Sequence, residues 1–470
     1  MRTRLLAGVA AVLVGAIAAT TGTAATPAGF KTARPAQLVP LGPGVMIDPI
    51  LSTGDTIGDY QMSGIPDGLG AYKTGGDTLQ VLMNHELDPA FFPFAPAGVG
   101  ARVSHLELNR KTHGVLSGSY PITGLEGFLR FCSSSLARLN GVPWYFTGEE
   151  GTDDHRASDN LGRGGSSIAL NVKTGDWVET AHFGRLLHEN IVPVKRLSKA
   201  FFLTTDDDFR GDAAHKAYLY AYIADSWSGA ISGSEGSLYV WTADAATSDA
   251  GLTKGQTLDG HFVPVTQVEN ATSDTLDAAS SDKNGFKFTR LEDASVSQER
   301  AGRVYFDDTG RLGANTVKGR LYRMDIDPSN PTHASVTLLL DGDASDDLIN
   351  PDNLATSAHS VVIQEDRNSE HRGPIVPGRP DDPGYGRILV YDVKTGTIRR
   401  VARVDTPAAL RPGTWESSGV INAQTLLGRG WWLVDVQAHD VIAPQPGMTL
   451  APDSSTGEDG QLLAIYIPNS

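Results

Sequence analysis

The sequence is short of cysteine, of long apolar runs and of positive charge, and each shortage excludes a class of protein. Cys132 is the only cysteine in 470 residues, so no disulfide can form within the chain. After Leu5–Ala19, no apolar run is long enough to span a membrane. The 39 basic residues face 55 acidic ones, which leaves a formal net charge of −16. Because such a chain repels nucleic acid and anionic lipid, we expect neither as a partner.

The first residues have the pattern of a secretory signal peptide. Arg2 and Arg4 precede the apolar run Leu5–Ala19, and small residues follow at Thr23–Ala25. Thr3 separates the two arginines, so the leader is of the Sec type rather than the twin-arginine type. We therefore predict a secreted, extracellular protein with residues 1–25 as its signal peptide. An uncleaved N-terminal anchor is the alternative.

Short apolar strands separated by Gly, Pro, Asp and Asn dominate the remaining chain. Three segments read as hairpins with a Lys-Thr turn: Leu106–Ser119, Ala169–Ala181 and Leu389–Ala402. In the two later hairpins, glycine follows the Lys-Thr pair and supplies the positive φ that a tight turn needs. Helical periodicity is scarce, so the fold class is all-β.

A second kind of segment is an apolar strand that ends on carboxylates. Such ends recur about every 60 residues, which is typical of a β-propeller; they lie at Glu86, Glu150, Asp208, Asp308, Asp366 and Asp435. If these are the inner strands of the blades, their carboxylates converge on one mouth of the central channel. We predict a β-propeller, with six blades as the best fit to the spacing, in one domain from 44 to 470. Residues 26–43 form an extended N-terminal segment, and a pair of β-sandwiches is the alternative fold.

Three loops gather oxygen ligands of the kind that calcium takes. They contain Glu149, Glu150, Asp153 and Asp154; then Asp206, Asp207, Asp208 and Asp212; then Asp341, Asp343, Ser345, Asp346, Asp347 and Asp352. None has the pattern of an EF-hand. Taken singly, each also fits a solvated turn.

Other short motifs add candidate site residues. His85-Glu86 and His188-Glu189 are His-Glu pairs, and on a strand only one member of each can face the channel. Arg290 and Glu292 share one face of a strand, and an arginine beside a metal-bound carboxylate suits an oxyanion such as phosphate. A surface ion pair is the alternative for these two residues. No His-Glu-x-x-His or Gly-x-Ser-x-Gly motif is present, which disfavours zinc proteases and serine hydrolases.

Taken together, these segments resemble the PhoX-type alkaline phosphatases, a family of secreted propeller enzymes that hydrolyse phosphate monoesters. The resemblance spans about Leu51 to Asp440 and consists of short pieces in a common order. The pieces are NHE at 84–86, FCSSS at 131–135, FTGEE at 146–150, FGRLLHE at 183–189, TTDDD at 204–208, TRLED at 289–293, NPDNLA at 350–355 and QED at 364–366.

The resemblance implies a cofactor of iron and calcium in the channel. Cys132, Glu189 and Glu292 match the iron-binding positions of the family, and Arg290 matches the arginine that grips the phosphoryl group. The surrounding calcium shell would contain Glu86, Glu149, Glu150 and Asp366. By itself a lone cysteine also fits an inert core residue or an intermolecular bridge, and the resemblance favours a metal ligand.

The predicted function is therefore that of a metal-dependent phosphoester hydrolase, a phosphate monoesterase similar to alkaline phosphatases. It would act as a monomer on a small phosphorylated substrate. One alternative is a non-catalytic secreted propeller that binds a partner and holds calcium alone. Another is a phosphodiesterase, phytase or lactonase on the same scaffold.

Overall fold

The computed structural model describes residues 26–87, 100–152, 164–210, 217–265, 271–345, 347–367, 384–441 and 458–470. Strands dominate these residues, as the sequence predicts. The helical elements are α1 (Trp227–Ser232), α2 (Ser273–Asp282), α3 (Gln424–Leu427) and a 3-10 turn at Ala181–Phe183. Among the described residues, no helix has the length and apolar character needed to cross a bilayer. The predicted signal peptide, 1–25, lies outside the described residues.

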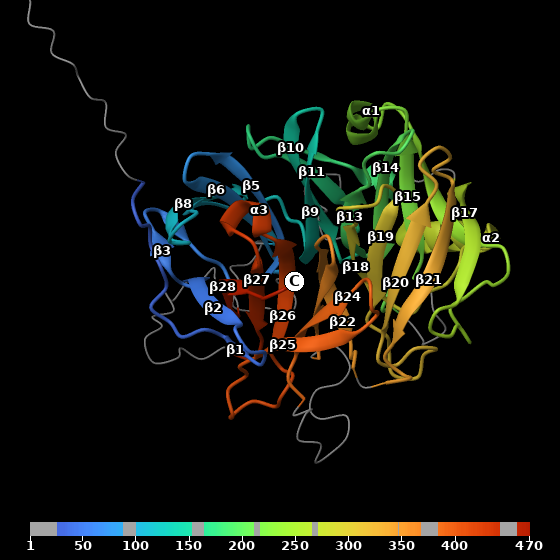
Figure 1. Cartoon of the computed structure of the whole chain (residues 1–470). Coiled ribbons are helices and arrows are strands. Elements are labelled where there is room, and N and C mark those ends of the chain that lie inside the picture. The colour runs from blue at the N-terminus through green and yellow to red at the C-terminus, as the bar shows by residue number, and fades with distance from the viewer. Residues whose placement is uncertain are drawn as a thin grey trace, which may run out of the picture.

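The strands form antiparallel sheets in a propeller-like arrangement (Figure 1). The first sheet contains β5 (Pro66–Gly75), β6 (Thr78–His85), β7 (Arg102–Asn109) and β8 (Val115–Ile122). The second contains β9 (Phe131–Leu139), β10 (Val142–Glu149), β11 (Ser167–Asn171) and β12 (Trp177–Glu179). A small hairpin of β3 (Thr56–Ile57) and β4 (Tyr60–Gln61) lies outside these sheets.

The largest sheet has nine strands and joins two successive runs of chain. The first run is β13 (His188–Pro193), β14 (Ala200–Asp206), β15 (Leu219–Ala224), β16 (Ser237–Ala243) and β17 (Thr257–Val265). The second run is β18 (Leu291–Val296), β19 (Arg303–Asp308), β20 (Arg320–Ile326) and β21 (His333–Asp341). Pairing between β17 and β21 makes the two runs continuous. The number of sheets therefore does not give the number of blades, and six blades stays a prediction.

The last two sheets take a strand from the start of the chain. One contains β22 (Pro351–Thr356), β23 (Ser360–Glu365), β24 (Arg387–Asp392), β25 (Ile398–Val404) and the early strand β1 (Leu38–Pro40). The other contains β26 (Glu416–Asn422), β27 (Trp431–Ala438), β28 (Asp459–Tyr466) and the early strand β2 (Met46–Ser52). Met46 pairs with Tyr466, so the two ends of the described chain close the arrangement together.

The innermost strands contact one another in a closed ring around a central channel. The order of contacts is β5, β9, β13, β18, β22, β26 and back to β5. Two of the hairpin turns predicted from the sequence, in β11–β12 and β24–β25, contain Gly175 at φ 79° and Gly396 at φ 71°. Both glycines adopt the left-handed conformation that the turn needs.

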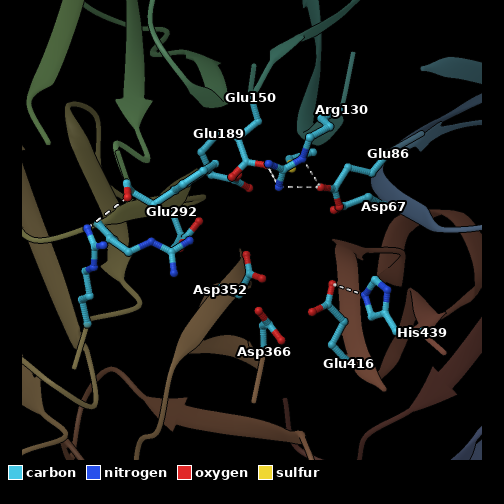
Figure 2. Close-up of a pocket in the computed structure, with 14 residues that line it drawn as sticks. Asp67, Glu86, Arg130, Glu150, Glu189, Glu292, Asp352, Asp366, Glu416 and His439 are labelled. Carbon is cyan, nitrogen blue, oxygen red and sulfur yellow. Dashed lines mark hydrogen bonds and ion pairs between the residues drawn. The ribbon is translucent and has the colours of Figure 1, made fainter. Parts of the chain in front are cut away.

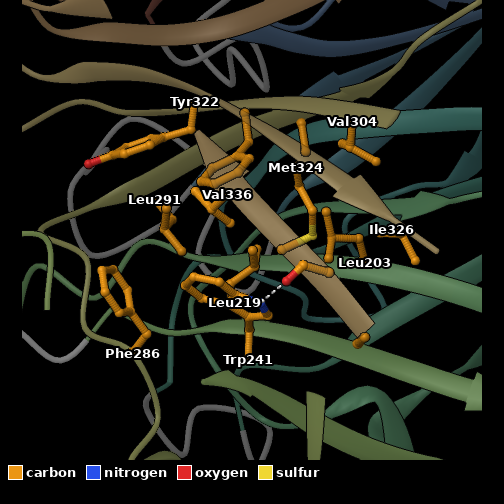
Figure 3. Packing of buried hydrophobic residues seen from close by; sticks show 14 of the residues in the cluster. Leu203, Leu219, Trp241, Phe286, Leu291, Val304, Tyr322, Met324, Ile326 and Val336 are labelled. Carbon is orange, nitrogen blue, oxygen red and sulfur yellow. Dashed lines mark hydrogen bonds between the residues drawn. The ribbon is translucent and has the colours of Figure 1, made fainter. Parts of the chain in front are cut away.

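Apolar side chains fill the space between neighbouring sheets. The largest cluster packs β14–β16 against β18–β21, and Figure 3 shows Trp241, Leu203 and Met324 at its centre. Trp241 is completely buried, and its indole nitrogen donates a hydrogen bond to the Ala334 carbonyl oxygen over 3.4 Å. Because burying a side chain of this size contributes about 1.5–3 kcal/mol, such clusters hold the sheets rigidly around the channel.

Candidate metal centre

The acid-ended strands found in the sequence are not the innermost strands, which corrects the sequence-based expectation. They are the second strands of their sheets: β6, β10, β14, β19, β23 and β27. Their ends still reach the channel mouth, because each pairs antiparallel with an innermost strand that begins there. The pairs Pro66 with His85, Leu291 with Asp308 and Pro351 with Glu365 mark this shared edge.

The innermost strands place a ligand residue at the same mouth. In β5, β9, β13, β18 and β22 this residue is the second of the strand: Asp67, Cys132, Glu189, Glu292 and Asp352. In β26 it is the first, Glu416. A shift in pairing register follows at once in each of these five strands, as in β18 between Leu291 and Ala294. Such bulges re-aim side chains at strand ends and are common beside functional sites.

These strand ends surround a cavity of about 380 Å³ (Figure 2). Eight carboxylates line it: Asp67, Glu86, Glu150, Glu189, Glu292, Asp352, Asp366 and Glu416. Cys132, His439, Phe209 and the arginines 130, 290 and 311 complete its wall. In Figure 2 the labelled carboxylates come from different strands and point toward one central space.

The acidic side chains form four triads whose candidate ligand atoms all lie within 4.8 Å of one another. The triads are Asp67–Glu86–Cys132, Cys132–Glu150–Glu189, Glu189–Glu292–Asp352 and Asp352–Asp366–Glu416. Neighbouring triads share Cys132, Glu189 or Asp352, so they form one continuous series. Two triads contain the thiol, which suits a softer transition metal, and two contain carboxylates alone, which suit calcium.

Burial and crowding make these acids costly to ionise without a compensating cation. Desolvation is the largest cause, and repulsion from neighbouring carboxylates is the next; together they raise the pKa values of Glu189 and Asp352 well above their usual range. Desolvation also raises the pKa of the Cys132 thiol, and raises that of Asp67 to about 8. Glu189 Oε1 is buried and has no hydrogen-bond partner within the described part of the chain. The donor set therefore fits bound metal ions, which would remove both costs.

Arg130 supplies positive charge at one end of the series. Its guanidinium lies 3.0 Å from Glu86 Oε1 and also pairs with Glu150. Burial acts to raise the pKa of Glu86, but Arg130, Gln437 and His439 together outweigh it, and the pKa is lowered. The Cys132 thiol donates to Glu150 Oε2 over 2.9 Å. Arg130, Glu86, Glu150 and Cys132 thus form one connected network, in which Glu150 and Cys132 are buried.

Arg290 lies beside Glu292 of the third triad and is held by several neighbours. Asp207 accepts from both Nε and Nη2, and Glu292 Oε1 lies 3.4 Å from Nη2. Asp308 accepts from the backbone N–H of Arg290 over 3.1 Å. The ring of Phe209 faces the Arg290 guanidinium at 5.6 Å from its centroid. Arg290 is therefore fixed beside the carboxylate ligands.

His439 lies at the remaining end. Its Nδ1 bonds to Glu458 Oε2 over 2.6 Å, and its Nε2 lies 3.7 Å from Glu416 Oε1. Burial acts to lower the pKa of His439, but Glu458 and the other nearby acids outweigh burial and raise it. His439 and Glu416 therefore lie side by side at the wall of the cavity.

Most of the residues predicted from the sequence meet in this cavity. It is lined by Cys132, Glu189, Glu292, Glu86, Glu150, Asp366 and Arg290. Glu149 is placed elsewhere, which departs from its expected place in the calcium shell. Its carboxylate accepts from the backbone N–H groups of Leu129 and Ser166, both over 3.0 Å. Asp153, Asp154, Asp212 and Asp346 lie outside the described residues.

The two histidines of the His-Glu pairs are structural. His85 bonds to Gly64 O and Ser104 Oγ, and His188 bonds to Thr204 Oγ1 and Gly184 O. Burial lowers the pKa of His188 to about 4, so its ring is neutral within the sheet. The glutamate of each pair faces the cavity instead.

Sequence reasoning missed Asp67, Glu416, His439 and Arg130, and it placed Asp352 only in an acidic loop. Asp67 and Glu416 stand at strand starts, whereas the repeat was read from strand ends. Asp67 and Glu416 could have been found from their position, because each lies two to four residues after the turn that precedes its innermost strand.

The chain matches no model of a known protein family, and no curated sequence matches it significantly. Its structure is similar to that of PhoX from Pseudomonas fluorescens, solved in complex with vanadate, a transition state analogue. The two are 15% identical, with 93% of this chain and 98% of that chain covered and a TM-score of 0.64. An α-L-arabinanase from Penicillium chrysogenum is more distant, at 10% identity, coverages of 91% and 99%, and a TM-score of 0.44. At these identities the similarity concerns architecture alone: this chain has a PhoX-like propeller fold.

Proposed function

We propose that this chain is a metal-dependent phosphoester hydrolase that acts on small phosphate monoesters. The observation that carries the proposal is the series of triads sharing Cys132, Glu189 and Asp352, with Arg290 fixed at its side. Metal ions bound there would supply Lewis-acid stabilisation of a transferring phosphoryl group. The PhoX-like fold and the vanadate complex of the Pseudomonas fluorescens protein support the same reaction class.

The residues of the chain divide into holders of the metals and a holder of the substrate. Cys132, Glu189 and Glu292 would hold the transition metal, proposed to be iron. Glu86, Glu150 and Asp366, with Asp67, Asp352 and Glu416, would hold calcium. Arg290 carries a planar set of donors that suits phosphate oxygens, and it would neutralise charge as the alcohol leaves.

Asp207 and Phe209 prepare Arg290 for this role. Asp207 fixes the plane of the guanidinium through two hydrogen bonds. Phe209 covers one of its faces with an apolar ring. A donor group held in place before substrate binds costs little reorganisation during the reaction. The cavity of about 380 Å³ fits a small substrate.

We further propose the architecture and location that the sequence predicts. The nine-stranded sheet counts as two blades joined through β17 and β21, which gives six blades in one domain over 44–470. Residues 1–25 would be a cleaved Sec-type signal peptide, so the protein would act outside the cell as a monomer. N-terminal sequencing of the protein recovered from culture medium tests the cleavage, and a first residue before Thr23 would contradict it.

The activity is tested by release of p-nitrophenol from p-nitrophenyl phosphate. We expect Glu292→Gln to lower kcat/KM by about 100-fold, since it removes a proposed ligand of the transition metal that would stabilise the transferring phosphoryl group. Glu299→Gln is the matched control, because Glu299 is exposed at the far end of the same hairpin. Chelator should abolish turnover, and calcium should restore it. Loss of thermal stability on chelation, without any turnover to lose, would indicate a non-catalytic calcium-binding propeller.

A further inference from the structure

The mouth of the channel opposite the metal centre carries a separate groove. β13 and β18 begin at the cavity with Glu189 and Glu292 and run to the other mouth, where each enters a turn. The two turns, 194–199 and 297–302, enclose a groove of about 470 Å³. Its wall contains four basic side chains, Lys195, Arg196, Arg300 and Arg303, and no acidic one.

Two of these cations have no acidic partner in the part of the chain that the structure describes. Lys195 and Arg196 are exposed, and neither has a carboxylate within 4.0 Å among the described residues. Lys199, in the same turn, is paired with Asp225 and does not line the groove. The chain as a whole carries a net charge of −16, so an exposed basic pair that no described carboxylate neutralises makes this part of the surface locally positive.

The arginines on the facing turn are only partly neutralised. Arg303 and Arg323 hydrogen-bond to Asp325 over 2.7 and 2.9 Å, and Arg300 lies 3.9 Å from the same carboxylate. Three guanidinium groups therefore share one carboxylate. Glu299, the acidic residue of that turn, lies 3.8 Å from His359 and does not line the groove. The groove keeps a net positive charge.

The backbone at Arg196 adds a second observation. This residue adopts φ 66°, in the left-handed region where glycine or asparagine is the usual choice. An arginine at such a position costs conformational energy that a glycine would avoid.

We propose that this groove binds linear inorganic polyphosphate. Guanidinium groups match phosphate oxygens in shape and charge, and cations on two facing turns would contact successive groups along one chain. The site lies at the end of β13 and β18 away from the metal centre, so binding there is independent of the proposed hydrolysis. The groove is the local exception to the repulsion of polyanions that the net charge predicts.

The test is the fluorescence anisotropy of labelled inorganic polyphosphate titrated with the full-length purified protein. We expect binding that weakens about 20- to 50-fold between 50 and 200 mM salt, as release of about three or four counterions requires. The double substitution K195E/R196E should weaken binding at least tenfold. The matched control, K173E/K254E, changes the net charge equally on exposed turns elsewhere and should bind within threefold of the wild type.

Arg290→Ala separates this groove from the metal centre. We expect it to bind polyphosphate like the wild type, whatever its effect on p-nitrophenyl phosphate hydrolysis. Loss of binding in Arg290→Ala, an equal loss in the two charge-reversal variants, or no binding by the wild type at 50 mM salt would each overturn the proposal. An inactive protein that still binds polyphosphate through Lys195 and Arg196 would overturn the proposed hydrolase alone.

Discussion

Asp207 holds Arg290 with both carboxylate oxygens, Oδ1 at 2.8 Å from Nε and Oδ2 at 2.5 Å from Nη2. Asp207 is completely buried, and Arg290 is half-buried at the wall of the candidate metal-binding cavity. Desolvation acts against the charge of Arg290, but Asp207, Glu292 and Glu150 together outweigh it and raise the pKa of the guanidinium. The arginine is therefore permanently charged and oriented before any substrate arrives.

Asp207→Asn should impair catalysis by releasing Arg290. One of the two charge-assisted hydrogen bonds is lost, which costs about 1.5–3 kcal/mol, or roughly 10- to 150-fold in kcat/KM. The neighbouring Asp208→Asn is the matched control, because Asp208 pairs with Arg210 rather than with Arg290. Steady-state kinetics on p-nitrophenyl phosphate measure both variants. Equal losses in the two would argue against a positioning role for Asp207.

Substitution by glutamine should affect different properties at the adjacent residues Glu149 and Glu150: stability at Glu149 and metal content at Glu150. In Glu149→Gln, one of the two backbone N–H groups would face the NH2 group of the new side chain and lose its acceptor. We therefore expect a loss of about 1–3 kcal/mol in unfolding free energy, with bound metal retained. Glu150→Gln removes a triad member and should reduce the metal content. Urea unfolding and elemental analysis of both proteins are the measurements. Metal loss in Glu149→Gln alone would contradict the assignment.

Cys132→Ser tests which metal the thiol selects. A hydroxyl is a harder and weaker ligand than a thiolate, so the transition metal should be lost while most of the calcium stays. The comparison is elemental analysis of the variant and the wild type after the same purification. Ser134→Ala, on the same strand, is the control. Retention of a full transition-metal complement in Cys132→Ser would show that the thiol is not a ligand.

The metal-free protein should lose stability as the pH rises. Burial and neighbouring carboxylates raise the pKa of Glu189, Glu292 and Asp352, so the folded state keeps protons that the unfolded state releases above about pH 4. This contribution is complete below that pH and is lost progressively as the pH rises toward the folded-state pKa values.

We therefore expect a lower Tm at pH 8 than at pH 5 in the presence of chelator. Calcium should reverse the trend, because the bound cation compensates the ionised carboxylates. Calorimetry at the two pH values, with and without calcium, measures the effect. A Tm of the chelated protein that rises from pH 5 to pH 8 would oppose the prediction.

The strand-rich architecture and most of the site could be predicted from the sequence. Carboxylates that recur after apolar strands, such as Glu86, Glu150 and Asp366, indicated one acidic channel mouth, and the structure places them around one cavity. The order of strands within each sheet could not be predicted in this way. Both strands of a pair are apolar and buried, and periodicity alone does not tell the innermost strand from the second one.

The individual ligands were harder to predict than the channel mouth. Glu149 and Glu150 are chemically identical neighbours, and only the pairing of β10 with both β9 and β11 shows that Glu149 serves two backbone amides. Asp67 follows a turn rather than an apolar strand, so the repeat did not include it. His439 and Glu416 approach each other only through the packing of β26 against β27.

The central claim is that the shared triads hold several cations at once, and elemental analysis of the protein purified without added metal tests it most directly. We predict more than one ion per chain, with both calcium and one transition metal, proposed to be iron, in the same sample. Less than one ion per chain, in a protein that is folded and monomeric, would contradict the account.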